Sequence, residues 1–276
     1  MSALYKFVSS KTSVLALARG SLKFTRIDDL NDPSEMSILM NDGAVGESLT
    51  KIRQFGYSKE QFSWLHHQGE LLARLSPETK ILSAPRTVEQ ANILLRSNIY
   101  DNIEYMRTSL FRTIALMRLR VGILSLTENY ASLPMWAHYA ANAAGYLVKF
   151  EGLKQVFAGD DTGSLNALKP VRYVEDLVGL THDPSTQDNL FFCKFRDWEY
   201  EREWRVVRVL SDCDSDSMPG LFLNHIDPSH ITNVFAGWKV AREEAEQLAL
   251  ELQAINPDMK FGIASLLRGK VNLHQP

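Results

Sequence analysis

The chain has 276 residues, of which 45% are hydrophobic and 23% are charged, and its net charge is -3. This composition is ordinary for a folded protein, and the weak negative charge gives no electrostatic reason to expect a nucleic-acid interface. No apolar run approaches the roughly 20 residues that span a bilayer. The start of the chain lacks the charged and then apolar pattern of a secretory leader, and two cysteines make no disulfide framework. We therefore expect a cytoplasmic protein with no membrane partner.

The first 27 residues predict a strand, a helix and a second strand. Residues 4–8 favour a short strand, and residues 12–19 favour a helix that ends at Gly20 in a left-handed cap. Residues 22–27 alternate between apolar and polar side chains, which is typical of a strand. Strand and helix therefore already alternate at the start of the chain.

The segment Asp32-Pro33-Ser34-Glu35 has the chemistry of a helix start. Asp32 can cap the helix, Pro33 fits its first position, and Glu35 can reach back to the N–H of the capping residue. If Asn31 instead faces a cleft, its side chain could hold a substrate amide. The sequence leaves both interpretations open.

Residues 48–120 are rich in helix formers, so we expect a helical insertion there. The spacing of apolar residues predicts helices near 64–75, 88–95 and 102–120. The last of these carries four arginines, which fit a solvated basic face better than a surface for an acidic partner.

The second half of the chain predicts most of the sheet. Residues 121–127 (VGILSLT) are apolar on both faces and should form a central strand. A helix over 133–143 follows, and Gly145 should supply a positive-φ turn into a strand over 146–150. Further elements are expected as strands at 204–210 and 231–236 and a helix at 242–255. The pattern indicates a single α+β domain, residues 1–276, with a mixed or antiparallel sheet core.

Four segments together resemble the bacterial family called domain of unknown function 2971. They are LYKF at 4–7, LNDPSE at 30–35, MWAHYAANAAGYLVKF at 135–150 and KFRDWEYEREWRVV at 194–207. The segment SLTE at 125–128 is similar to that family's serine-rich strand. The resemblance covers roughly residues 4–237 and implies common ancestry rather than a chemistry.

The opening strand, helix and strand are also similar to those of ADP-ribosyltransferase-like domains. Such domains use a histidine or arginine on the first strand, a serine or tyrosine on a middle strand and a glutamate on a late strand. The resemblance implies that Lys6 or Tyr5, Ser125 with Thr127, and Glu201 or Glu203 take these places. Lys6 departs from the usual residue at the first of them.

The resemblance implies NAD as the substrate and an acceptor that is a protein or a nucleic acid, in a toxin or phage-defence effector. Breaking the nicotinamide–ribose bond develops positive charge on the sugar, and a carboxylate beside the ribose stabilises that charge. We expect Glu203 in this role and Glu201 as the partner that faces the acceptor. In an extended segment the two would share a face, and each would raise the proton affinity of the other. No metal is expected.

The remaining candidate residues have alternatives that the sequence leaves open. Trp136 and Tyr139 share a helix face and either pack in the core or line a slot for nicotinamide. Lys6 either contacts a cofactor phosphate or is a charge on an edge strand that discourages aggregation. The hydroxyls of Ser125 and Thr127 either orient the ribose or bond to neighbouring backbone. Glu201, Glu203 and Arg205 also fit a solvated edge of ion pairs.

Two other functions stay open. A non-catalytic module that binds a nucleotide or a protein is favoured by Lys6 at the position of the expected histidine or arginine. A metal-dependent nuclease would need acidic residues that converge on a cation, and Asp28, Asp29, Asp32 and Glu35 are the candidates for it.

Overall fold

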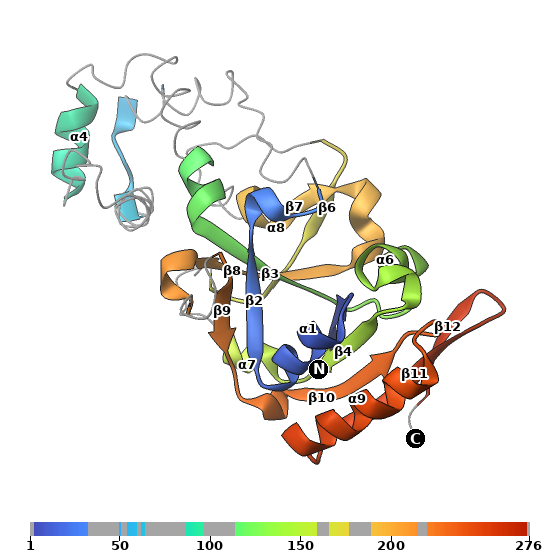
Figure 1. Ribbon diagram of the computed structural model, residues 1–276. Helices are drawn as coiled ribbons and strands as arrows, with labels where there is room; N and C mark the ends of the chain where they lie inside the picture. The colour runs from blue at the N-terminus through green and yellow to red at the C-terminus, as the bar shows by residue number, and fades with distance from the viewer. Residues whose placement is uncertain are drawn as a thin grey trace. The chain divides into compact units, whose positions relative to one another are not determined.

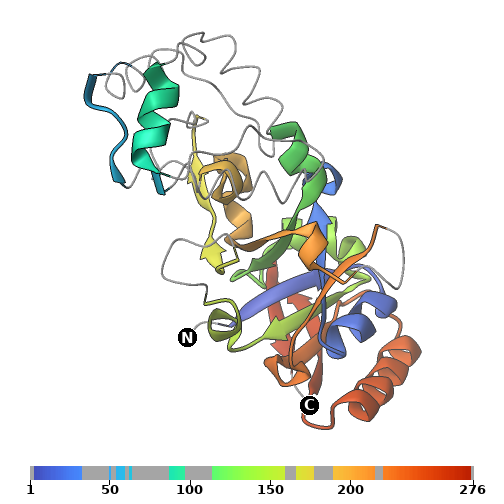
Figure 2. The same ribbon diagram turned by 90° about the vertical axis from the view of Figure 1, so that its left-hand side faces the viewer.

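A computed structural model describes residues 3–32, 50, 54–59, 62–63, 87–96, 114–158, 166–176, 189–214 and 220–274 (Figures 1 and 2). The chain divides into two compact units. The first unit takes residues 1–25, 122–173 and 196–276, and the second takes residues 26–121 and 174–195. Helices and a large mixed sheet together confirm the predicted α+β class.

One mixed sheet forms the core of the first unit. In the described part of the chain its strands follow the order β12-β11-β10-β4-β1-β3-β2-β9, with β8 paired to β3 and β5 paired to β8. The strands are β1 Leu4–Val8, β2 Ser21–Arg26, β3 Val121–Thr127, β4 Tyr146–Phe150, β5 Lys169–Pro170, β8 Glu203–Val209, β9 Phe222–His225, β10 Ile231–Ala236, β11 Lys260–Leu267 and β12 Lys270–His274. Strand β10 runs parallel to β11 and antiparallel to β4.

The first strand of the chain lies between two strands that follow it by more than a hundred residues. Strand β1 pairs with β3 at Tyr5 and Thr127 and with β4 along its whole length. Six of the seven residues of β3 are buried, as the expected central strand requires. The sheet centre is therefore built from the most apolar segments, because strands buried on both faces need side chains that lose little on leaving water.

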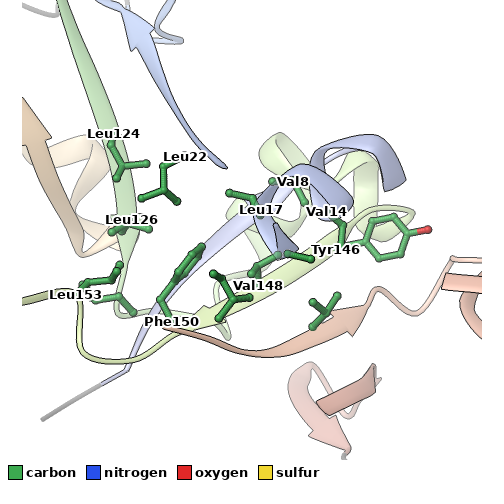
Figure 3. Packing of buried hydrophobic residues seen from close by; sticks show 14 of the residues in the cluster. Val8, Val14, Leu17, Leu22, Leu124, Leu126, Tyr146, Val148, Phe150 and Leu153 are labelled. Atoms are coloured by element: carbon green, nitrogen blue, oxygen red, sulfur yellow. The ribbon is translucent and has the colours of Figure 1, made fainter. Parts of the chain in front are cut away.

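Two helices cover one face of this sheet. Helix α1 (Lys11–Ala18) contributes Val14 and Leu17, and helix α9 (Arg242–Ile255) contributes Leu248 and Leu252. These side chains form one hydrophobic cluster with residues of β1, β3 and β4, and Figure 3 shows part of it. Helix α9 presents its apolar stripe to the sheet and its charged side to solvent, whereas the exposed residues of α1 are Thr12 and Ser13.

Helix α6 (Leu133–Tyr139) packs on the other face. Side chains alternate along a strand, so Phe7 points away from the cluster that holds Leu4 and Val8. Phe7 meets Trp136 edge-on with ring centroids 5.1 Å apart. The short helix α7 (Leu153–Val156) follows β4. The helix expected over 133–143 ends at Tyr139, since residues 141–143 have positive φ angles.

Glycine is required at two element boundaries, after α1 and before β4, for different reasons. Gly20 has φ +83° after α1, which confirms the predicted left-handed cap. Gly145 does not have the positive φ that we expected, so that prediction is wrong. A side chain at Gly145 would instead lie 2.9 Å from the carbonyl oxygen of Ala140 and would collide with that of Val8. Close approach of the backbone is therefore what requires glycine here.

The second unit contains helical segments and short strands in its described residues. Helix α4 spans Val88–Arg96, close to the predicted range, and residues 114–120 are helical before β3 begins. Helix α8 (Asn189–Phe192) leads into β7 (Cys193–Phe195), and the short strand β6 (Arg172–Val174) spans the boundary at which the chain passes from the first unit to the second. The expected helices near 64–75 and over 102–113, and the segment from Pro33 to Glu35, lie outside the described residues. Among the helices that can be described, none has the length and apolarity needed to cross a membrane.

Candidate active site

The three strands that carry the expected site residues are direct neighbours in the sheet. Strand β3 pairs with β1 and with β8, so residues near positions 6, 125 and 203 lie on adjacent strands (Figure 1). These strands are far apart in sequence, and only the fold brings them together. The expected late strand begins at Glu203, one residue before its predicted start.

Lys6, whose side chain is half-buried, supplies an ammonium group at this place. Its Nζ donates a hydrogen bond of 2.9 Å to the backbone carbonyl oxygen of Ser125. Burial lowers the pKa of Lys6 from 10.5 to about 8, the carboxylate of Glu203 opposes this shift, and the charge of Lys23 adds to it. The ammonium therefore lies within electrostatic range of Glu203. The acceptor of this hydrogen bond lies on the neighbouring strand β3, and β1 itself is paired on both sides. Lys6 is therefore not a solvent-exposed charge on an edge strand.

Glu203 is buried and forms an ion pair with Arg205. The Glu203 side chain is 5% exposed, and Nε and Nη2 of Arg205 donate to its two carboxylate oxygens at 2.8 and 2.9 Å. The two residues are two apart on β8, so they share a face of the strand. The backbone N–H of Glu203 donates to the hydroxyl of Tyr173 at 2.8 Å, and desolvation raises the pKa of Tyr173. A bidentate guanidinium is the geometry that best compensates a carboxylate taken out of water.

Glu201 is also buried, but it belongs to a different local structure. It ends the 3-10 helix Arg196–Glu201, and Arg202 has φ +45° before β8 begins. The segment is therefore not extended, and the expectation that Glu201 and Glu203 share a strand face is wrong. Instead, the hydroxyl of Tyr139 donates a hydrogen bond of 2.6 Å to Glu201 Oε1.

The end of β3 holds this turn in place. The hydroxyl of Thr127 donates to the backbone carbonyl oxygen of Glu201 and accepts from the backbone N–H of Asn129 at 2.8 Å. The side-chain amide of Asn129 donates to the carbonyl oxygen of Tyr200 at 2.9 Å. The Thr127 hydroxyl thus bonds to neighbouring backbone, which is one of the two roles that the sequence left open for it. One of these bonds is to Glu201, a candidate catalytic residue.

The burial of both carboxylates excludes the solvated edge as an account of this segment. Glu201 and Glu203 are 3% and 5% exposed, and Arg205 is 1% exposed. Two carboxylates, one guanidinium and one ammonium make a set with no net charge when all four are ionised.

The other residues expected in the site are Tyr5, Trp136 and Asn31, and their surroundings differ. Tyr5 lies opposite Thr127, and its ring contacts that of Tyr130 at a tilt of 54° with ring centroids 5.4 Å apart. Trp136 is 1% exposed, packs against Phe7 and donates from Nε1 to a backbone carbonyl, which favours its core-packing alternative over a nicotinamide slot. Asn31 is exposed and belongs to the second unit.

No family model, curated protein or solved structure matches this chain. Sequence reasoning treated Arg205 only as one member of a solvated edge, although its i, i+2 spacing from Glu203 already predicted a shared face. Tyr173 and Asn129 were missed, because their contacts depend on where separate loops meet and no local pattern marks them.

The acidic cluster proposed for a nuclease has other partners. Arg118 Nε lies 2.6 Å from Asp28 Oδ1, and the guanidinium of Arg26 donates to both oxygens of Asp29 at 2.9 and 3.1 Å. Glu35 is outside the described residues. Within those residues, no group of three or more histidine, cysteine or acidic side chains is placed to hold a metal ion.

Proposed function

We propose that this chain is an ADP-ribosyltransferase-like enzyme that uses NAD as its substrate and is related to the domain of unknown function 2971 family. The observation that supports the proposal is the adjacency of β1, β3 and β8, with the Lys6 ammonium in electrostatic range of Glu203. A first, a middle and a late strand are the ones that the resemblance assigns to such a site. Here they are neighbours, and each brings a residue of the required charge or polarity.

In this proposal Glu203 lies beside the ribose that carries nicotinamide. The bond between ribose and nicotinamide breaks, nicotinamide leaves with the bonding electron pair, and the carboxylate stabilises the positive charge left on the sugar. The acceptor nucleophile then bonds to that sugar carbon, and its proton passes to Glu201. Arg205 holds Glu203 in position through two hydrogen bonds. Lys6, with a pKa of about 8, is mainly protonated at neutral pH and attracts a phosphate of NAD.

The test is incubation of the pure protein with NAD that carries a label in its ADP-ribose part, together with a cell lysate. We expect release of nicotinamide and transfer of the label to a macromolecule. Replacing Glu203 by glutamine should reduce both by at least about a hundredfold, because it removes a charge that acts on the transition state. The absence of both reactions in the unmodified protein would exclude the proposal.

Glu199→Gln is the matched control for this substitution. Glu199 is four residues upstream of Glu203, and its side chain is 62% exposed. The control should keep full activity. Circular dichroism and the unfolding midpoint of each variant separate a lost catalytic group from a lost fold. Equal activity in the folded Glu203→Gln variant and the control would remove Glu203 from the reaction.

One observation favours a second candidate, a module that binds a nucleotide without reacting with it. Lys6 stands where the resemblance expects histidine or arginine, and it is engaged by the carbonyl of Ser125. A binder would unfold at higher temperature in the presence of NAD by mass action, while the NAD concentration stays constant. The enzyme consumes NAD in the same mixture.

A further inference from the structure

A second polar site lies in the first unit where β4 ends and β10 and β11 begin. A hollow of about 660 Å³ opens there, which is within the size range of small-molecule sites. Its lining combines strand residues with the loop that follows α9. The hollow belongs to a different part of the sheet from β3 and β8, so the transferase proposal does not use it.

Thr232 and Asn233 of β10 line this hollow, and each has one buried polar side-chain atom that makes no hydrogen bond within the described part of the chain. Asn233 is 3% exposed, and its amide nitrogen makes no hydrogen bond to any of the described residues; the buried hydroxyl of Thr232 makes none either. An unsatisfied buried donor costs free energy, and nearly all buried polar groups in folded proteins find a partner. A bound ligand that supplies an acceptor would remove this cost.

A β-bulge presents these side chains. The pairing of β10 with β4 shifts register between Ile231, which lies opposite Phe150, and Asn233, which lies opposite Lys149. Thr232 is the extra residue. Bulges are frequent beside functional sites, because they change the direction of a side chain without ending the strand. The bulge therefore places an orphan hydroxyl next to an orphan amide.

Two lysines flank Asn233 in direct register. Asn233 lies opposite Lys149 on β4 and opposite Lys260 on β11, which Figures 1 and 2 show as strands on either side of β10. Side chains of directly opposed residues point to one face of a sheet. The three donors therefore form a row. Lys149 Nζ also lies 2.6 Å from Glu151 Oε1, whereas Lys260 forms no ion pair with the described residues.

Acidic residues complete the lining. Glu151, Asp227 and Asp258 contribute three carboxylates against the two lysines, so the lining carries a net charge of one negative. This charge disfavours a phosphate dianion, because three carboxylates would repel it. It suits a ligand that presents an anionic end to the row of donors and a cationic end to the carboxylates.

We propose that this hollow binds a small zwitterion of the amino-acid class. The ligand carboxylate accepts hydrogen bonds from the amide of Asn233 and from Lys260. Its ammonium group lies against Asp227 and Asp258, and Thr232 bonds to whichever end reaches it. The site is independent of NAD turnover, and its loss would leave the transferase proposal unchanged.

The test measures thermal unfolding of the whole chain with each common L-amino acid in turn at millimolar concentration, followed by calorimetry of those that act. At about a hundredfold excess over Kd, a ligand should raise the unfolding midpoint by roughly 5 °C. Inorganic phosphate and glucose are the comparison ligands. The proposal is overturned if no amino acid raises the midpoint, or if phosphate or glucose does so through Asn233.

Three variants assign the effect to the hollow. Asn233→Leu keeps similar volume and removes the orphan donor, so it should weaken amino-acid binding by roughly tenfold or more without lowering the midpoint of the free protein. Lys260→Met, on an exposed side chain, should also weaken binding and keeps the test decisive if the first variant does not fold. Lys270→Met, an exposed lysine of β12 outside the hollow, should bind like the unmodified protein. Unchanged binding in both Asn233→Leu and Lys260→Met would refute the site.

Discussion

Lys6 makes the stability of the folded protein depend on pH in a way that one substitution isolates. Burial lowers its pKa from 10.5 to about 8. Below pH 8 the folded chain keeps a charged ammonium in a place that disfavours it. Between pH 8 and 10.5 the unfolded chain holds a proton that the folded chain has released, so the free energy of unfolding rises with pH through this window.

The size of the effect follows from the shift. One pKa unit corresponds to about 1.4 kcal/mol, so the shift of Lys6 gives on the order of 3 kcal/mol between the two ends of the window. This is an upper value, because part of the Lys6 side chain keeps contact with solvent. The attraction between Lys6 and Glu203 partly offsets the cost of burial, and without it the pKa of Lys6 would be lower still.

Urea unfolding of the original protein and of Lys6→Met across this pH range is the assay. The difference in free energy of unfolding between them cancels the titration of all other groups, and it should change in favour of the original protein as pH rises from 8 to 10.5. Lys239→Met, on an exposed side chain, should show no such trend. A Lys6→Met difference that stays constant over the window would refute the burial argument.

Three further predictions concern the buried ion pair, the backbone contact at Gly145 and the packing of α9 in the first unit. Arg205→Met leaves the buried Glu203 carboxylate without its partner and should lower the free energy of unfolding, measured in urea, by about 3–5 kcal/mol. The double variant with Glu203→Leu should recover part of this loss, and strict additivity of the two substitutions would contradict the pairing. Gly145→Ala should lower the thermal midpoint by several degrees, because its methyl group meets backbone atoms of Val8 and Ala140; an unchanged midpoint would show that the backbone can yield. Leu248→Ala opens a cavity under α9 at a side chain with no exposed area and should cost about 2–5 kcal/mol, a loss that calorimetry would measure and that a value below 1 kcal/mol would contradict.

The sequence predicted the elements whose burial is strongest and whose ends are marked by turn residues. Strands β1, β3, β4 and β10 and helix α9 have the predicted bounds. Each is an apolar or amphipathic run, and local periodicity is enough to define such a run. The hairpin of β11 and β12 was missed, although Arg268 and Gly269 form its two-residue turn with φ +51° and +76°, a backbone typical of tight hairpins. The apolar residues Ile263 and Leu267 of β11 are exposed, so the strand lacks the regular alternation of apolar and polar side chains that would have marked it.

The candidate site was predictable in its strands but not in its contacts. The resemblance to ADP-ribosyltransferase-like domains indicated a first, a middle and a late strand, and β1, β3 and β8 are neighbours in the sheet. The conformation of Glu201 was not predictable, because it depends on a 3-10 helix and on a positive φ at Arg202, a residue type that rarely adopts one. The hollow at Asn233 depends on a bulge, which alternation alone does not reveal.

The position of β1 in the middle of the sheet has a consequence for biosynthesis. The ribosome makes Leu4–Val8 well before its partner strands, which begin only at Val121 and Tyr146. At a translation rate of about 5–20 residues per second, the nascent segment waits for several seconds with both edges unpaired. Glu203 is added later still, so folding intermediates on the ribosome expose an unpaired apolar strand and hold no complete candidate site. A chaperone that binds short extended apolar segments would find a target in Leu4–Val8 until β3 and β4 are made.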